Sequence, residues 1–333
     1  MMKFSFWLRH ICVCATALTV MLTYGCSNQL GQSDGRKVIA VVPKSTAHVY
    51  WQAVYAGALT AAQELDVDIL WMGPPDETMK DQQISIVEDF ITLRVDGIAL
   101  APQDSNALVS VVERAALANI PCVVFDSGVN SDQYVSFIAT DNYIGGVNAA
   151  HEAARRLGNQ GTCIIIGAQP GSESNTERER GFEETLAKEY PNIQIIDKQI
   201  GYNDREKSRA VTEDMLTAHP DVNAIFGPNE PSIYGALLAV QARQKAGEII
   251  LIGFDASSEL VEAMKKDEVH ALALQNPFFM GRQSVITLMA QFNGEEVPKR
   301  IDTGVTIATK ENMNDDAIQA LLDPDLSILN SNN

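Results

Sequence analysis

Short apolar runs alternate with stretches of helical periodicity from residue 37 to about residue 309. The apolar runs are rich in Val and Ile and end at polar or turn-forming residues, which is typical of strands buried on both faces. They predict strands over 37–42, 68–72, 97–101, 122–125, 135–139, 162–167, 194–200, 224–227, 249–253, 270–274 and 301–307.

Amphipathic stretches separate most of these runs and predict helices, most clearly over 52–65, 78–92, 107–118 and 208–218. Strand–helix alternation indicates parallel sheets covered by helices on both faces and joined by right-handed crossovers. The strands outnumber those of one sheet of about six, so the pattern predicts two lobes, with a break near Thr140. The expected fold class is α/β, with two doubly wound parallel-sheet lobes.

Ligands of such sheets bind beyond the carboxyl ends of the strands, so the loops there are candidate sites. The loop after the first strand, PKSTAHVYW, has no glycine before Gly57 and carries the adjacent aromatics Tyr50 and Trp51. A phosphate-binding loop would be rich in glycine. An aromatic face suits the apolar face of a sugar ring instead, so this loop favours a neutral ligand. The alternative is that both aromatics belong to the core.

Polar side chains follow the other strands in a mixture of carboxylates, amides and an arginine. Because each sugar hydroxyl is both donor and acceptor, this mixture suits a sugar. An unpaired buried polar group costs about 1–3 kcal/mol, so such a site would reject a sugar that lacks one hydroxyl. The simpler alternative is that the Asp and Asn residues cap helices, and that Arg178 and Arg180 lie on a solvated helix face. The strand-end residues are Asp126, Asp141, Asn142, Arg178, Tyr202, Asn203, Asn229, Asp255, Gln275 and Asn276.

Residues 1–26 have the pattern of an export signal, with a basic start and an apolar segment, 11–22, that is too short to span a membrane comfortably. Its end resembles a bacterial lipoprotein cleavage site, in which Cys26 becomes the lipidated first residue, although Tyr24 departs from the usual pattern. The alternative, a retained membrane anchor, would leave the same domain outside the membrane. The polar segment 27–36 is suited to a tether.

The chain has 25 Lys and Arg against 43 Asp and Glu, a net charge of −18, and no basic cluster. Such a surface disfavours nucleic acid and anionic lipid as partners. The length beyond the signal suits two domains. Cys122 and Cys163 are most simply small buried side chains, and a disulfide between them stays open. No Cys or His spacing suggests a metal site, and no cofactor is expected.

From Lys37 to about Ala308 the chain resembles the periplasmic sugar-binding proteins of the ribose/galactose type, the solute receptors of ABC uptake systems. The matching segments are HVYWQAVYAGA, VDGIALAPQDSNAL, ANIPCVVFDS, IATDNYIGG, ERERGF, LTAHPDVNAIFGPNE, LIGFDAS and ALALQNP. The resemblance implies a type I periplasmic binding protein whose lobes exchange strands. One lobe would take 36–139 plus 277–304 and the other 141–275 plus 305–325, with hinges near Thr140, Asn276 and Val305. It also implies a monomer.

The resemblance further implies a set of ligand-binding residues. His48 stands where the ribose pattern has an asparagine, and Ser127 stands where that pattern has an arginine beside the aspartate. The second departure removes a charged fork, so the resemblance indicates a pentose or hexose without naming ribose. Either Asn203 or Tyr202 falls at a further aromatic of the pattern. The implied set is His48, Tyr50, Trp51, Asp126, Arg178, Asn203, Asn229, Asp255 and Gln275.

The expected function is that of an exported protein, anchored in the membrane by lipid on Cys26, that closes on a monosaccharide and delivers it to an ABC permease. A receptor that feeds a sensor, a chemotaxis system or quorum-signal uptake would have the same site. A glycoside-acting enzyme would use Asp126 with Asp255, but the chain has no nucleophile elbow, phosphate loop or HExxH motif. A transcriptional regulator of this fold would carry a DNA-binding domain in place of the export signal.

Overall fold

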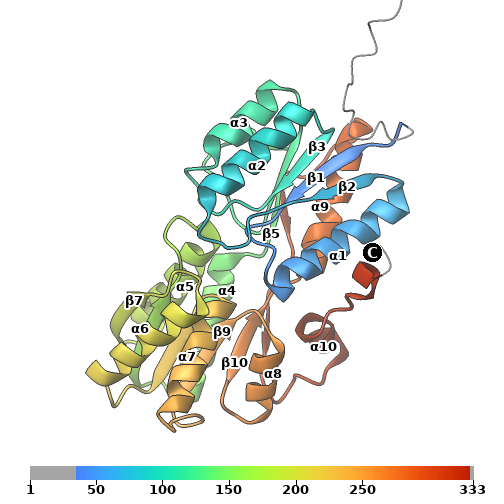
Figure 1. Cartoon of the computed structure of the whole chain (residues 1–333). Helices are drawn as coiled ribbons and strands as arrows, with labels where there is room; N and C mark the ends of the chain where they lie inside the picture. Colours follow the sequence, from blue (N-terminus) through green and yellow to red (C-terminus); the bar gives the residue numbers. More distant parts are fainter. Residues whose placement is uncertain (1–34, 331–333) are drawn as a thin grey trace, which may run out of the picture. The chain divides into compact units, whose positions relative to one another are not determined.

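Two six-stranded sheets organise the described part of the chain, residues 35–330, in the computed structural model (Figure 1). The first sheet has the strand order β11-β5-β4-β3-β1-β2, and all its neighbours are parallel. Its strands are β1 Val38–Val42, β2 Asp68–Trp71, β3 Gly97–Leu100, β4 Cys122–Phe125, β5 Ser136–Ala139 and β11 Arg300–Asp302.

The second sheet has the order β12-β10-β9-β8-β6-β7. Its neighbours are parallel except β10 and β12, which pair antiparallel at one edge. The predicted fold class of two doubly wound α/β lobes is therefore confirmed, with one antiparallel edge strand that the pattern did not indicate. The strands are β6 Gly161–Gly167, β7 Ile193–Ile200, β8 Ala224–Gly227, β9 Ile250–Phe254, β10 Ala271–Leu274 and β12 Thr306–Ala308.

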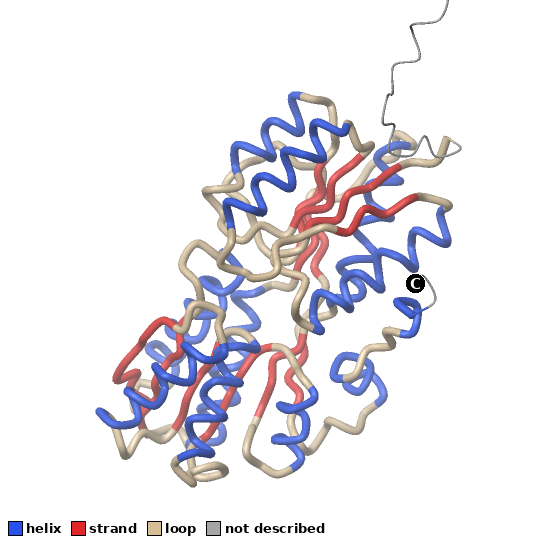
Figure 2. Tube along the Cα trace, in the orientation of Figure 1, coloured by secondary structure: helices blue, strands red, loops and turns tan. Residues whose placement is uncertain are grey.

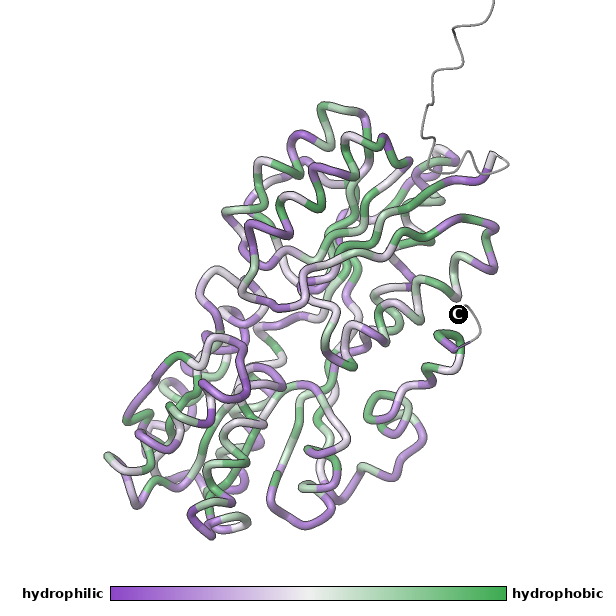
Figure 3. Tube along the Cα trace, viewed as in Figure 1, coloured by the Kyte–Doolittle hydropathy of each residue, from purple (hydrophilic) through white to green (hydrophobic). Residues whose placement is uncertain are grey.

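Helices cover both faces of each sheet (Figure 2), which explains why central strands such as β1, β3, β4, β8 and β10 are continuously apolar. In β1, Ile39 and Val41 pack in one apolar cluster, whereas Ala40 and Val42 pack in another on the opposite face. Hydrophobic residues accordingly run along the strands of both sheets in Figure 3. The helices are α1 Val49–Leu65, α2 Lys80–Leu93, α3 Val109–Leu117, α4 Asn142–Leu157, α5 Glu173–Glu189, α6 Arg205–Ala218, α7 Glu230–Ala242, α8 Ser258–Lys265, α9 Pro277–Phe292, α10 Asp316–Leu322 and the 3-10 turn η1 Ser327–Asn330.

The run 301–307, predicted as one strand, is two strands in different sheets. β11 pairs with β5 and β12 pairs with β10, and the chain passes between the sheets at Thr303 and Gly304. Gly304 has a φ of 76°, which glycine adopts without a steric penalty. The single-strand prediction was wrong because both halves have the same apolar alternation, and residue pattern does not specify which sheet a strand joins.

Close helix pairs flank both sheets and depend on glycines. In the first pair, a Cβ at Gly57 of α1 would lie 1.9 Å from the carbonyl oxygen of Phe278, and a Cβ at Gly281 of α9 would lie 1.9 Å from that of Val54. The backbones of α1 and α9 therefore touch, although more than two hundred residues of sequence separate them. This contact places α9 on the first sheet, beside β4 and β5.

In the second helix pair, α4 packs against α5 at the backbone of Arg178. A Cβ at Gly146 would lie 2.0 Å from the carbonyl oxygen of Arg178 and 2.9 Å from the amide nitrogen of Phe182.

We expect Gly146→Ala to lower the free energy of unfolding by about 3 kcal/mol and to displace Arg178, because neither backbone can yield without separating the helices. Urea denaturation checks this. Gly146→Val should lose more stability than Gly146→Ala, and unchanged stability of both variants would contradict the prediction.

Cys122 of β4 and Cys163 of β6 are both free and buried, in different sheets. Burial raises the pKa of each thiol to about 12. The prediction that they are small buried side chains is confirmed. Within residues 35–330, no helix has the length and apolar character that crossing a membrane requires.

Candidate functional site

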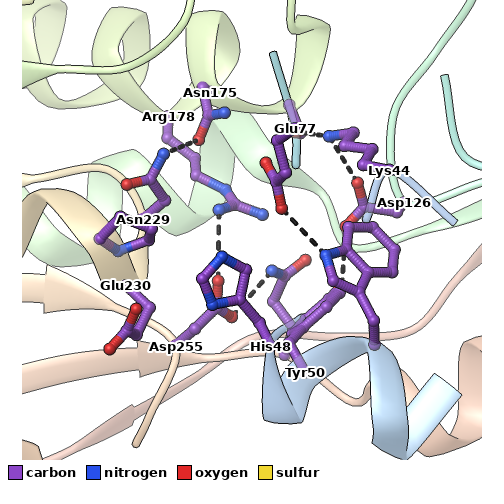
Figure 4. Close-up of a pocket in the computed structure, with 14 residues that line it drawn as sticks. Lys44, His48, Tyr50, Glu77, Asp126, Asn175, Arg178, Asn229, Glu230 and Asp255 are labelled. Atoms are coloured by element: carbon purple, nitrogen blue, oxygen red, sulfur yellow. Dashed lines mark hydrogen bonds and ion pairs between the residues drawn. The ribbon is translucent and has the colours of Figure 1, made fainter. Parts of the chain in front are cut away.

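A polar cleft lies where loops from the carboxyl ends of strands in both sheets come together (Figure 4). Its cavity volume is about 40 Å³, room for roughly three water molecules. A sugar ring of about ten heavy atoms would need more space, so a sugar could enter only if the cleft widened. The lining residues are Lys44, His48, Tyr50, Trp51, Glu77, Asp126, Ser174, Asn175, Arg178, Asn229, Glu230, Pro231, Asp255 and Gln275.

The structure brings eight of the nine predicted ligand-binding residues together around this cleft. The exception is Asn203, which does not line the cavity but contacts two residues that do. Its Oδ1 accepts a hydrogen bond from Asn229 at 2.7 Å, and its Nδ2 donates to Glu77 at 3.0 Å. Its neighbour Tyr202, the alternative at this position, is 44% exposed and also lies outside the lining. The eight are His48, Tyr50, Trp51, Asp126, Arg178, Asn229, Asp255 and Gln275.

Trp51 belongs both to the core and to the cleft. It is 3% exposed and packs edge to face against Tyr50 and Phe125, with ring centroids 4.9 and 6.4 Å away. Its Nε1 donates to Oε1 of Glu77 at 2.9 Å, at the cleft. The alternative that this aromatic is a core residue is therefore correct, and it does not exclude a role at the site.

Tyr50 is fixed as a hydrogen-bond donor. Its hydroxyl donates to Oδ1 of Asp126 at 2.7 Å. Burial, together with the charges of Asp126 and Asp255, raises the pKa of Tyr50 well above its usual value. The hydroxyl therefore keeps its proton at neutral pH and holds the Asp126 carboxylate in one orientation.

A buried lysine, Lys44, pairs with Asp126. Asp126 follows β4 with a φ of 63°, a left-handed conformation that Asp tolerates better than most residues. Its Oδ2 lies 2.7 Å from Nζ of Lys44, which is 3% exposed and also donates to Ser127 at 2.7 Å. Ser127 stands where the ribose pattern has an arginine. Lys44, from the loop after β1, places a positive charge beside Asp126 instead.

Arg178, from α5, is 2% exposed and held on three sides. Its Nε donates to Oδ1 of Asn142 at 2.8 Å, and its Nη1 donates to the carbonyl oxygen of Pro228 at 3.0 Å. The guanidinium lies 4.2 Å from the ring centroid of Phe254, and Nη1 is 3.6 Å from Oδ2 of Asp255. Residues around the guanidinium thus fix its plane before any ligand binds.

Arg180 shows the opposite environment two residues later on the same helix. Its side chain is 47% exposed and forms ion pairs with Glu177 and Glu184. The alternative of a solvated helix face was therefore wrong for Arg178 and right for Arg180. Helix capping is likewise confirmed for Asp141, which accepts from the Ile144 amide at 3.0 Å.

Asp255 is the second carboxylate at the centre of the cleft. It follows β9 with a φ of 62°, and its Oδ1 accepts from Nε2 of Gln275 at 2.9 Å. Burial raises the pKa of Asp255 to about 6, against the opposing effects of Arg178 and Gln275. The charges of Asp126 and Glu77 raise this pKa further. Asp255 is therefore mostly ionised at pH 7 but takes up a proton in mild acid.

This shift predicts a pH-dependent stability. Because the folded pKa lies above the ordinary 3.8, the folded protein keeps a proton that the unfolded chain has released. The contribution of Asp255 is fully present below about pH 4 and is lost as the pH rises through about 6. The full difference between a pKa of 3.8 and one of about 6 corresponds to about 3 kcal/mol. We expect the unfolding free energy of the parent, relative to Asp255→Asn, to fall by most of that amount, about 2.5 kcal/mol, between pH 4 and 7. Urea titrations of both proteins measure it, and parallel pH profiles would contradict it.

Sequence reasoning missed several lining residues, two of which had a usable signal. Glu77 follows β2, and the strand-end rule that indicated the other site residues applies to the loops after β2 and β3 as well. Asn175 precedes Arg178 by three residues and so shares its helix face. Among residues 35–330, no grouping of His, Cys, Asp and Glu could hold a metal ion. The missed residues are Lys44, Glu77, Ser174, Asn175, Glu230 and Pro231.

Comparison with known proteins identifies the family. Residues 39–296 match the family described as Periplasmic binding protein domain. The ribose import binding protein of Bacillus subtilis (strain 168) is 30% identical over 230 residues, 69% of this chain and 74% of that protein. The D-ribose/D-allose-binding protein of Pseudomonas aeruginosa is 30% identical over 283 residues, 81% of this chain and 88% of that protein.

Solved structures agree. A carbohydrate transporter solute-binding protein of Agrobacterium radiobacter, in complex with D-arabinose, has a TM-score of 0.85 and 30% identity, covering 87% of this chain and 100% of that one. An ABC transporter solute-binding protein of Agrobacterium vitis with bound D-fucose has a TM-score of 0.83 and 33% identity, covering 86% of this chain and 99% of that one.

The fold and the cleft thus define a two-lobed binding protein with a polar site between its sheets. The chain belongs to the periplasmic binding protein family, as its sequence motifs predicted. This family consists of exported substrate-binding proteins of transport systems, so membership implies export to the periplasm.

Proposed function

We propose that this protein captures a monosaccharide, a pentose or hexose, in the cleft and delivers it to an ABC-type importer. The observation that carries the proposal is the lining itself. Two ion pairs, Asp126 with Lys44 and Asp255 with Arg178, meet beside the aromatic side chain of Tyr50. Sugar hydroxyls would use the carboxylates as acceptors and the guanidinium as a donor. The sugars named for its relatives support the same ligand class.

Binding would proceed by closure of two lobes, 36–139 plus 277–304 and 141–275 plus 305–325, about hinges near Thr140, Asn276 and Val305. Hydrogen bonds between two of the segments that would join the lobes, 139–140 and 303–304, support this division. Oγ1 of Thr140 donates to the carbonyl oxygen of Gly304 at 3.1 Å, and the Thr303 amide donates to that of Ala139 at 3.2 Å. A ligand that contacts both lobes would favour the closed form, in which the site is buried from water.

The protein would be monomeric and would reach the membrane through lipid on Cys26, with 27–36 as a tether. Cys26 and most of the tether lie outside the described residues. Metabolic labelling with a radioactive fatty acid in a bacterial host tests the anchor. Label should enter the parent and be absent from Cys26→Ser, and equal labelling of both would overturn the anchor while leaving the sugar site untouched.

Calorimetric titration of residues 27–333 tests the ligand class, since the helices and strands of the described residues lie in the compact unit that begins at Lys37. The panel is ribose, xylose, arabinose, galactose, glucose, allose and myo-inositol. One of them should bind one to one, with micromolar or lower Kd, and Asp126→Asn should lose this binding. The role of Trp51 is tested with Trp51→Phe and not with Trp51→Ala, because Trp51 is buried and the alanine variant would leave a destabilising cavity. No heat from a folded protein would contradict a simple-sugar ligand, and turnover of a glycoside would favour the enzyme alternative.

A further inference from the structure

Glu77 bridges residues that approach the cleft from the two sheets. It lies on the loop between β2 and α2, and its Oε1 accepts from the indole Nε1 of Trp51 at 2.9 Å. Its Oε2 accepts at 3.0 Å from Asn203, which follows β7 of the second sheet. Gln103 fixes the loop by donating to the carbonyl oxygen of Asp76 at 3.0 Å. The carboxylate of Glu77 is therefore held at the cleft with both of its oxygens engaged by neutral donors.

Glu77 differs from the other carboxylates of the lining in having no cationic partner. Within the part of the chain that the structure describes, no Lys, Arg or His lies within ion-pair distance of it, whereas each of the others has one. With His48 counted as neutral, the lining and its partners therefore carry one uncompensated negative charge. The compensated pairs are Asp126 with Lys44 at 2.7 Å, Asp255 with Arg178 at 3.6 Å, and Glu230 with Arg205.

A second observation in the same cleft also indicates a missing donor. Gln275 lines the cavity, is 3% exposed, and commits its Nε2 to Asp255. Its Oε1 is buried and has no hydrogen-bond partner anywhere in residues 35–330. Lys44 is not available to either group, because it already contacts Asp126 and the hydroxyls of Ser127 and Ser174. An unpaired acceptor and an unpaired charge therefore lie in one small cavity, and burying both against a neutral ligand would cost free energy.

We propose that the ligand carries a protonated amine, so that this cleft binds an amino sugar in preference to its neutral parent. The inference rests on the proposed function and narrows its ligand class. An ammonium group has a positive charge and three donors and no acceptor. It would neutralise the charge of Glu77 while leaving the ring hydroxyls to the paired carboxylates and to Arg178. Glu77 is then the residue that determines this specificity.

Matched sugar pairs test the preference by calorimetry on residues 27–333. Glucose and galactose are compared with their 2-amino-2-deoxy and 6-amino-6-deoxy forms, and with the N-acetylated 2-amino forms, which have lost the charge. At least one amine should bind about tenfold more tightly than both its parent and its N-acetyl form, since a hydrogen bond to a charged group contributes at least that factor to affinity. Glu77→Gln should reduce this preference to about threefold or less.

The control is Glu113→Gln, an exposed position on α3 outside the cleft lining, which removes the same charge from the protein and should keep the preference. The parent protein alone can overturn the inference, whatever the folding of the variants. If neutral sugars bind as well as or better than every amine, the inference fails and the proposed function stands. The same holds if Glu77→Gln keeps the preference. If no sugar of either kind binds to folded protein, both fail.

Discussion

Replacing Lys44 by methionine will lower the free energy of unfolding by about 3–5 kcal/mol and abolish ligand binding. Lys44 is buried, and among the residues that the structure describes its removal leaves the Asp126 carboxylate in a low-dielectric site with only the Tyr50 hydroxyl as partner. The same change removes a contact to Ser174 of α5 at 3.1 Å, which ties the loop after β1 to the second sheet's helices. Urea denaturation measures the stability, and calorimetry measures binding of whichever sugar the parent binds.

A double variant separates the stability lost with the lysine side chain from the cost of leaving the Asp126 carboxylate buried without a cation. Lys44→Met combined with Asp126→Asn removes both charges, so it should recover at least about 2 kcal/mol of what Lys44→Met alone loses. Binding should stay lost in the double variant even though its stability recovers, because the acceptor carboxylate of Asp126 is gone. If the double variant were less stable than Lys44→Met, the contacts of Lys44 with the serine hydroxyls, and not its pairing with Asp126, would account for the loss.

Arg178→Lys keeps the charge but will weaken ligand binding by at least about a hundredfold. Lysine cannot reproduce the planar fork that donates to Asn142 and to the carbonyl of Pro228, nor the stacking over Phe254. Those three contacts fix the orientation of the donors that face the cleft. We also expect the free energy of unfolding to fall by about 3 kcal/mol, because these buried acceptors lose their donor. Calorimetry and urea denaturation measure the two effects.

The chain provides a matched control for this substitution two residues later. Arg180→Lys, on the same helix, changes an exposed side chain whose partners Glu177 and Glu184 are at the surface. Exposed pairs contribute little, so stability should change by less than about 0.5 kcal/mol and affinity should not change. Comparable losses in Arg178→Lys and Arg180→Lys would show that the burial and the three contacts of Arg178 do not matter for binding.

Most of the cleft could be located from strand ends alone. Asp126 follows β4, Asn229 follows β8 and Asp255 follows β9, and the structure brings all three to one cavity. Parallel strands of one sheet end at the same edge, which brings Asn229 and Asp255 together. Asp126 follows a strand of the other sheet and joins them because the cleft lies between the two edges. The loop after β2 obeys the same rule, so Glu77 could have been predicted from its position in the same way.

Residue pattern could not decide where individual side chains pair. Ser127 was interpreted as the loss of a charge, yet Lys44 supplies a cation there from another strand's loop. Arg178 and Arg180 are two residues apart in one helix, and burial alone distinguishes them. The contacts that bury Lys44 and Arg178 join residues at least 36 positions apart in the sequence, and local periodicity does not encode such contacts.

The sequence by itself determined the alternation of strands and helices, the two-lobed α/β fold and the family. Those properties follow from hydrophobic periodicity and turn chemistry, which act over neighbouring residues. Only the tertiary structure decided that Trp51 is mostly core, and that Glu77 has no cationic partner among residues 35–330. Each of these depends on which surfaces pack together, and packing is a property of the whole chain.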